Sequence, residues 1–270
     1  MPRRIKLTLE YDGTDFKGWQ VQCGGPAGTG TGGARTVQGV VERALLKVAG
    51  QPIRIAGASR TDTGVHALEQ VASFLLPDEV LVPTGDLCMA LNANMDKDVA
   101  ARRAEDAALD FHAQRDSSGK IYAYSIVSGR CRAAFWRRTH WHAHYDLKID
   151  PMRKAAEALI GRHNFTSFAT KLAETQEQRA EEGKQALDTT KEIRRLELCE
   201  DPGYPGRVVM HIEGSGFLYQ MVRTIAGSLV DVGRGFRPPE WMAEALAAHD
   251  RRRAGPTAPP HGLCLLRVLY

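Results

Sequence analysis

The segment TVQGVVERALLKVAG, residues 36–50, predicts the first helix of the chain. Its apolar side chains recur at the three- and four-residue spacing of one helix face: Val37, Val40, Val41, Leu45 and Val48. Threonine is favoured at helix N-caps and glycine just past C-termini, so Thr36 and Gly50 mark the two ends. The segment therefore predicts an amphipathic helix that needs a sheet or a second helix to cover its apolar face.

Strand patterns lie on both sides of this helix. Residues 5–11 before it alternate apolar and polar, and residues 53–56 and 68–76 after it read as two more strands. A second helix fits residues 83–92, and a weaker strand fits residues 98–104. The resulting order, β-α-β-β-α-β, is that of the split βαβ or ferredoxin-like unit.

The second half of the chain repeats this order without repeating the sequence. The predicted elements are strands at 121–127, 191–199, 207–212 and 263–269, and helices at 150–160, 217–232 and 241–248. We therefore predict an α+β fold of two domains, residues 1–108 and 109–270, with the boundary near residues 105–115.

Composition limits the classes of protein that this chain can belong to. With 270 residues, 43% hydrophobic and 25% charged, it has the average make-up of a globular protein. No run approaches twenty apolar residues, so we expect no membrane span. The five cysteines are odd in number and never at C-x-x-C spacing, which favours reduced thiols in the cytoplasm over disulfides or a cysteine zinc site. His140, His142 and His144 alternate, and fit either a metal-binding strand face or an ordinary polar edge.

The charge pattern permits an anionic partner. The net charge is +4 and the isoelectric point is about 8.8. Two basic clusters are present: Arg130, Arg132, Arg137 and Arg138 among Phe135, Trp136 and Trp141, and then Arg251, Arg252 and Arg253. Arginines interleaved with aromatic residues suit phosphate contact and base stacking, and equally suit a solvated protein face.

A candidate site lies at residues 60–67, RTDTGVHA, between two predicted strands. A tight loop fixes its backbone, so the carboxylate of Asp62 can be aimed, while Arg60 can stabilise that anion or reach a phosphate or a base. The same arginine, aspartate and glycine spacing also fits a plain exposed turn.

Two segments fit no regular element. Residues 24–33 are rich in glycine, but no Gly-Lys-Ser/Thr follows them, so they are not a P-loop. We interpret them as a flexible excursion, and the alternative is a phosphate-contacting segment. Residues 171–184 are charged and helix-permissive but lack an apolar stripe, which predicts a mobile surface loop or one that becomes ordered on a ligand.

Eight motifs follow one another over nearly the whole chain: Leu9 to Thr14 with Phe16 and Gly18 to Gln20; Thr36 to Gly39; Arg60 to Ala67; Leu91 to Asn94; Phe111 to Ala113; Lys120, Tyr122 and Tyr124; Gly216 to Arg223; and Ala254 to Leu263. In sequence and in order they resemble the motifs of the TruA-type tRNA pseudouridine synthases. The chain departs from the family pattern at His112-Ala113-Gln114-Arg115 and in the long glycine run, which affects details of RNA contact.

This resemblance implies an isomerase that converts uridine to pseudouridine at positions 38–40 of tRNA, on the 3′ side of the anticodon stem-loop. The implied fold is two ferredoxin-like domains that share one extended antiparallel sheet, with helices packed on one side and the active cleft between the domains. The resemblance also implies a homodimer that uses neither a metal nor an organic cofactor.

The resemblance assigns a role to each site residue. Asp62 matches the catalytic carboxylate, and Arg223 matches its basic partner. Arg60 matches the residue that fills the space left by a flipped nucleotide, and Tyr122 matches the aromatic residue of the uracil pocket. By pattern alone, Arg223 fits a helix surface and Tyr122 fits a strand core. Two other functions stay open: a tRNA-binding protein that has lost catalysis, and an N-glycosylase that releases free uracil.

Overall fold

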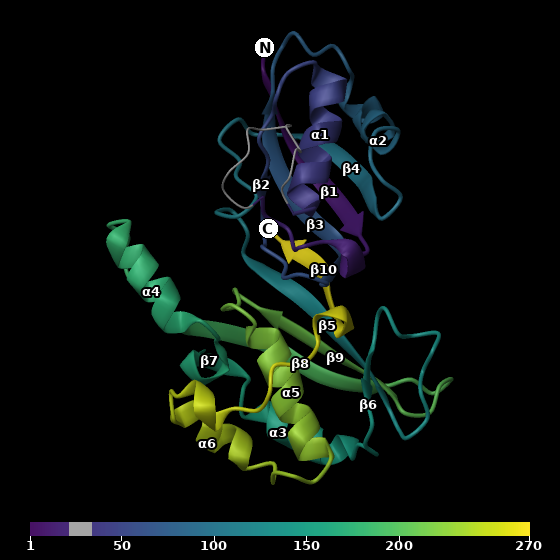
Figure 1. Ribbon diagram of the computed structural model, residues 1–270. Helices are drawn as coiled ribbons and strands as arrows, with labels where there is room; N and C mark the ends of the chain where they lie inside the picture. Colours follow the sequence, from purple (N-terminus) through teal and green to yellow (C-terminus); the bar gives the residue numbers. More distant parts are fainter. Residues whose placement is uncertain (22–33) are drawn as a thin grey trace. The chain divides into compact units, whose positions relative to one another are not determined.

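The computed structural model describes residues 1–21 and 34–270, which form two compact units (Figure 1). The first unit comprises residues 1–118 and 264–270, and the second comprises residues 119–263. Both combine helices with mostly antiparallel strands. The glycine-rich segment Gly24–Gly33, for which we predicted an excursion, lies outside the described residues.

The first unit follows the predicted order of elements. They are β1 (Arg3–Tyr11), α1 (Val37–Ala49), β2 (Ala56–Gly57), β3 (His66–Leu76), α2 (Thr84–Asn92) and β4 (Val99–Ala107). The strands β4, β1, β3 and β2 lie side by side in that order, and each neighbouring pair is antiparallel. The last strand, β10 (Leu263–Leu269), runs parallel to β3 at residues 264 and 265, on the same edge of β3 as β2 and opposite β1. Helices α1 and α2 cover one face of this sheet (Figure 1).

Both predicted ends of α1 are confirmed. The Thr36 side chain accepts a hydrogen bond from the Gly39 N–H at 3.2 Å, and Gly50 adopts a left-handed φ of 70° while its N–H bonds Leu46. The helix buries its predicted apolar face, including Val41 and Leu45, which are both 0% exposed. Burying such a side chain stabilises a fold by roughly 1.5–3 kcal/mol.

The strand predicted at residues 53–56 is wrong in extent, because only Ala56 and Gly57 pair with β3. Ile53 and Ile55 are buried as expected, at 6% and 5% exposure. However, the Ile55 N–H donates to the Glu42 carboxylate at 3.2 Å, and its carbonyl accepts from the Gln38 side chain at 3.3 Å. Polar side chains of α1 thus satisfy the backbone groups that a neighbouring strand would otherwise bond.

The second unit has a four-stranded antiparallel path in the order β5, β9, β8, β7. A short strand, β6, adds to β5 in parallel. Helices α3 and α5 pack together, α3 also on β8 and α5 also on β5. The elements are β5 (Gly119–Ser128), β6 (Trp141–Ala143), α3 (Ile149–Glu157), β7 (Gly161–Asn164), α4 (Leu172–Glu181), β8 (Thr190–Glu200), β9 (Arg207–Gly214), α5 (Met221–Gly233) and α6 (Trp241–Ala247).

Helix α5 begins four residues later than the predicted start at residue 217. Gln220 has a left-handed φ of 59°, which ends any helix that would enter from the preceding residues. Thr170 fixes this turn, since its N–H donates to the Tyr219 carbonyl at 3.2 Å and its hydroxyl donates to the Gln220 side chain at 2.8 Å. Once started, α5 is buried on nearly all sides.

Residues 171–184 were predicted to form a surface loop, and residues 172–181 instead form helix α4. The helix has no buried residue and extends away from the sheet of its own unit (Figure 1). Its alanine, leucine, glutamate, glutamine and arginine residues are good helix formers, so no apolar stripe is required locally. Gln176 ties it to the following segment through two hydrogen bonds with the backbone of Leu187, at 2.8 and 3.1 Å.

Residues 109–118 pack with the first unit, although they follow the predicted boundary at residue 108. The Ala113 N–H donates to the Ser73 hydroxyl at 3.0 Å, and the Ala113 carbonyl accepts from the Tyr270 hydroxyl at 2.9 Å. The Ser118 N–H donates to the Leu269 carbonyl at 2.8 Å. Among the described residues, no helix has the length and apolar character needed to cross a membrane.

Candidate active site

Asp62 lies half-buried on the loop between β2 and β3, and the backbone of this loop is fixed on both sides of it. The Trp19 N–H donates to the Thr61 carbonyl at 3.0 Å, and the Gly64 N–H donates to the Phe16 carbonyl at 3.3 Å. Within the loop, the Val65 N–H bonds the Asp62 carbonyl at 3.1 Å. The segment after β1 therefore positions the backbone that carries the carboxylate, while the Arg60 side chain is exposed.

Close backbone approach at this loop requires glycine. A Cβ on Gly18 would lie 2.7 Å from the Thr61 carbonyl oxygen, and Gly18 also has a left-handed φ of 88°. A Cβ on Gly13 would collide with the Val65 carbonyl oxygen. The two glycines of the first motif thus let the chain after β1 lie directly against the Asp62 loop.

A buried network of polar side chains supports the Asp62 loop. The Tyr11 hydroxyl lies 2.8 Å from the Thr61 hydroxyl, and the Gln70 side chain donates to the Ser59 carbonyl at 2.7 Å. The Gln70 Nε2 also donates to the Tyr11 hydroxyl at 3.5 Å, and Gln70 is 0% exposed. Sequence reasoning missed Gln70, although a lone amide inside the apolar run 68–76 was a usable sign of a buried polar role.

His66 follows the loop and anchors the start of β3. Its Nδ1 lies 3.1 Å from Asp12 Oδ1 and 3.1 Å from the Gly13 backbone nitrogen, and its side chain is buried. On the other edge of β3, residues 66 and 67 pair with Cys264 and Leu265 of the C-terminal strand. The segment after β1 and the C-terminal strand β10 thus both contact the start of β3, where the Asp62 loop enters the sheet.

Tyr122 lies on β5 of the second unit, where it pairs with Ile212 of β9 and is 6% exposed. Phe217 meets it edge to face, with 5.4 Å between ring centroids. Side chains two residues apart lie on the same face of a strand, so Lys120 and Tyr124 share that face. Burial lowers the pKa of the Lys120 ammonium.

Arg223 lies half-buried in the first turn of α5 and is bonded to the C-terminal segment. Its Nε donates to the Ala258 carbonyl at 2.8 Å, and the Ala258 N–H donates back to the Arg223 carbonyl at 3.1 Å. The Tyr124 hydroxyl donates to the next carbonyl along the chain, that of Pro259, at 2.7 Å, and burial raises the pKa of Tyr124. The Ala258 carbonyl therefore orients the guanidinium of Arg223 through its Nε–H.

The four predicted site residues fall into two pairs. Arg60 and Asp62 share one loop of the first unit. Tyr122 and Arg223 lie on β5 and α5 of the second unit, two elements that pack against each other.

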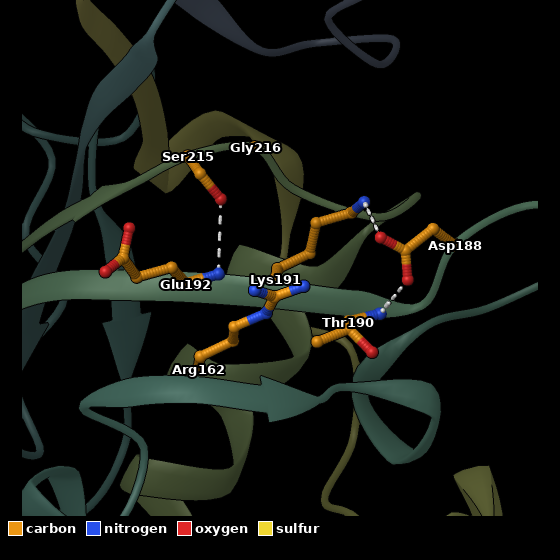
Figure 2. A pocket seen from close by; sticks show the side chains of 7 residues that line it. All are labelled: Arg162, Asp188, Thr190, Lys191, Glu192, Ser215 and Gly216. Carbon is orange, nitrogen blue, oxygen red and sulfur yellow. Dashed lines mark hydrogen bonds and ion pairs between the residues drawn. The ribbon is translucent and has the colours of Figure 1, made fainter.

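A separate polar pocket of about 370 Å³ lies in the second unit (Figure 2). Two cations, Arg162 and Lys191, and two acids, Asp188 and Glu192, line it. Lys191 Nζ lies 3.9 Å from Asp188, whereas Glu192 pairs with Arg194 at 3.3 Å. The other lining residues are Thr190, Ser215 and Gly216. No sequence motif predicted this pocket, because its members come from three separate segments.

The alternating histidines do not form a metal site. In the described part of the chain, no cluster of three or more histidine, cysteine, aspartate or glutamate side chains could hold a metal ion. His142 and His144 have ring centroids 4.2 Å apart, whereas His140 accepts a hydrogen bond from Arg207 at 3.0 Å.

Comparison with known proteins identifies the class. The sequence model of the tRNA pseudouridine synthase family matches residues 8–116 and 155–270. A tRNA pseudouridine synthase A of Myxococcus xanthus is 43% identical over 270 residues, covering 100% of this chain and 92% of the relative. A second, from Solidesulfovibrio magneticus, is 42% identical and covers 99% and 91%. One from Thermotoga petrophila is 39% identical and covers 99% and 100%.

The chain therefore belongs to the tRNA pseudouridine synthase family, whose members are isomerases that convert uridine to pseudouridine in tRNA. The resemblance found in the sequence motifs is confirmed.

Proposed function

We propose that this protein isomerises uridine to pseudouridine at positions 38–40 in the anticodon stem-loop of tRNA, with Asp62 as the catalytic carboxylate. The observation that carries the proposal is the full-length similarity to tRNA pseudouridine synthases A, at 43% and 42% identity. The half-buried, backbone-anchored loop of Asp62 supports the assignment, because catalysis needs a carboxylate held in one position.

The reaction needs no redox partner. The bond from the ribose to uracil N1 breaks, the uracil turns, and a new bond forms from the ribose to C5, whose proton leaves while N1 gains one. Asp62 can act by attacking the sugar or the ring, or by removing a ribose proton. Each of these routes requires the carboxylate to be ionised near the extruded nucleoside.

The remaining site residues would serve that carboxylate and its substrate. Arg223 would stabilise the Asp62 anion, since a nearby cation favours the charged form of an acid. Tyr122 would stack on the uracil, and exposed Arg60 would fill the space that the flipped uridine leaves in the stem, where extrusion costs a few kcal/mol. This requires the two units to act as ferredoxin-like domains of one extended sheet, with Asp62, Tyr122 and Arg223 meeting in the cleft between them.

The family resemblance also suggests an assembly and a cellular location. We expect a cytoplasmic homodimer with isologous contacts, in which tRNA is the partner and neither a metal nor an organic cofactor takes part. The described cysteines, Cys88, Cys131, Cys199 and Cys264, are all free thiols, which suits a reducing compartment.

Release of tritium from tRNA labelled at uracil C5 tests this function. The synthase should release tritium without free uracil, and an Asp62→Asn variant should release almost none. Asp78→Asn, which changes an exposed acid of the same unit, is the matched control and should react like the parent. Free uracil would identify an N-glycosylase, and tRNA binding without tritium release would identify a binding protein.

A further inference from the structure

The segment between β5 and β6, residues 129–140, is a basic and largely exposed feature of the second unit; we call it the arginine loop. It contains four arginines and no acid within twelve residues, and all four are exposed: Arg130, Arg132, Arg137 and Arg138. Phe135, at the centre of the loop, is 83% exposed. None of these residues belongs to the site proposed for catalysis.

The side chain of Trp136 holds the arginine loop in place. Trp136 packs under the guanidinium of Arg207, whose Cζ lies 4.6 Å from the ring centroid, and against His140, also at 4.6 Å. The Trp136 carbonyl accepts from the N–H groups of Thr139 and His140 at 3.0 and 2.9 Å. Phe135 stands at 88° to the Trp136 ring, with 4.8 Å between centroids. An inward tryptophan therefore holds an outward phenylalanine in place.

His140 stays neutral in this arrangement. Arg207 is a donor only, and its Nε lies 3.0 Å from His140 Nε2, so that nitrogen must accept. The proton then sits on Nδ1, which donates to the Thr139 hydroxyl at 2.9 Å. Burial, together with the charge of Arg207, lowers the pKa of His140 to about 4. The charge of the loop at neutral pH therefore comes from its arginines.

Three of these arginines have no acidic partner. Among the described residues, no carboxylate lies within ion-pair distance of Arg130, Arg132 or Arg137. Arg137 makes only a long hydrogen bond, at 3.4 Å, to the Ala134 carbonyl. A cluster of unpaired guanidinium groups beside an exposed aromatic ring matches the chemistry of RNA, which offers phosphates and unstacked bases.

We propose that the arginine loop is an additional tRNA contact, in which its arginines bind backbone phosphates and Phe135 stacks on an unpaired base. The inference rests on the proposed function, because that function supplies the polyanionic substrate. Charge complementarity favours RNA over a second copy of the chain. An isologous interface brings a patch against itself, and this loop would place arginines against arginines, since none of its own residues is acidic.

The contact lies away from Tyr122. Six residues of β5, 123–128, separate Tyr122 from Gly129, which corresponds to roughly 20 Å along an extended strand. A substrate as large as tRNA can reach both positions, whereas a nucleoside cannot. Loss of the contact should therefore raise KM for tRNA more than it lowers kcat.

Filter binding of unmodified tRNA at several salt concentrations tests the proposal. Replacing Arg130, Arg132 and Arg137 with alanine should reduce the slope of log Kd against log salt by about 2 to 3, since each phosphate contact contributes about 0.7–0.9. The matched control replaces Arg153, Lys154 and Arg195, three exposed cations of the same unit that pair with carboxylates, and should retain the slope.

Phe135→Ala should weaken tRNA binding about five- to 150-fold, which corresponds to the roughly 1–3 kcal/mol lost with one stacked base. Phe135→Leu keeps apolar bulk but has no π face, so it should resemble the alanine variant. Both side chains replace an exposed ring, and unchanged thermal unfolding would show that the fold is retained.

The outcomes separate the two proposals. If the parent protein releases no tritium from tRNA, the proposed function fails. The salt dependence of tRNA binding still tests the role of the arginine loop in that case. If the arginine and Phe135 variants bind with the affinity and slope of the control, the loop inference fails even in an active enzyme. Sedimentation gives a third outcome: a dimer that dissociates in the arginine variant, with tRNA binding unchanged, would make the loop a contact between copies and overturn the inference.

Discussion

Gln70 forms a reciprocal pair of hydrogen bonds with the backbone of Ser59. Its Nε2 donates to the Ser59 carbonyl at 2.7 Å, and its Oε1 accepts from the Ser59 N–H at 3.3 Å. The side-chain amide of Gln70 thus bonds both backbone groups of Ser59, as a residue of a neighbouring strand would. Because Ser59 lies three residues before Asp62, the amide extends the order of the sheet into the loop that carries the carboxylate.

Replacing Gln70 with leucine should therefore both destabilise the protein and slow it. The substitution removes both of these hydrogen bonds from the backbone of Ser59, which costs about 1–3 kcal/mol in the free energy of unfolding. Urea unfolding measures that loss, and single-turnover tritium release should fall because the Asp62 loop loses its support. Gln114→Leu, at an exposed position of the same unit, is the control. Equal stability of the two variants would contradict the role given to Gln70.

Gly18→Ala should impair catalysis beyond its effect on backbone strain. The new Cβ would lie 2.7 Å from the Thr61 carbonyl oxygen, so the Asp62 loop must move away from the chain after β1. Gly50→Ala is the matched control, since Gly50 also has a left-handed φ, 70°, but no atom lies within 4 Å of its added Cβ. Both variants should lose about 1 kcal/mol of stability from the φ alone, and Gly18→Ala should lose more. A tritium-release rate equal to that of Gly50→Ala would refute the argument.

The sequence predicted the elements whose determinants are local. The caps at Thr36 and Gly50 and the apolar spacing between them are sufficient to define α1. The start of α5 was not predictable in the same way, because Thr170, fifty residues away, fixes the turn at Gln220. The strand expected at 53–56 failed for a similar reason: Glu42 takes the backbone bond of Ile55.

The site residues were harder to predict from sequence patterns than the helices and strands were. Asp62 lies in a loop whose spacing also fits a plain turn, and buried Tyr122 reads as an ordinary core residue of β5. Their assignment came from the family resemblance, which orders eight motifs along the chain. The supporting role of Gln70 could be inferred only indirectly from the sequence, because its partners Ser59 and Tyr11 come from two other segments.

Arg223→Lys should nearly abolish activity while leaving the fold intact. A lysine keeps the charge but lacks the Nε–H that bonds the Ala258 carbonyl at 2.8 Å, so that carbonyl no longer orients the cation in the same way. We expect tritium release to fall by about 10²–10³, the usual cost of losing one positioned electrostatic contact. Arg153→Lys, at an exposed position, is the control. A variant with parental activity would show that Arg223 serves only to bind the C-terminal segment.

Acid should loosen the arginine loop through His140. Burial and the charges of Arg207 and His261 depress the pKa of this imidazole from 6.5 to about 4, so the folded protein favours its neutral form. The stability that this preference contributes is complete above pH 6.5 and is lost as the pH falls through about 4. Protonation removes the acceptor of the Arg207 hydrogen bond, and the packing of Trp136 should weaken with it.

Nuclear magnetic resonance of the imidazole tests this directly. Long-range proton–nitrogen correlations should show the proton on Nδ1 at neutral pH, and the His140 ring should titrate with a pKa of about 4, below that of an ordinary histidine. In an Arg207→Met variant the pKa should rise, but not fully, because burial remains the larger cause of the shift. A proton found on Nε2 at neutral pH, or a His140 that titrates near 6.5 in the parent protein, would mean that Arg207 does not donate to it and that the order of the arginine loop has another origin.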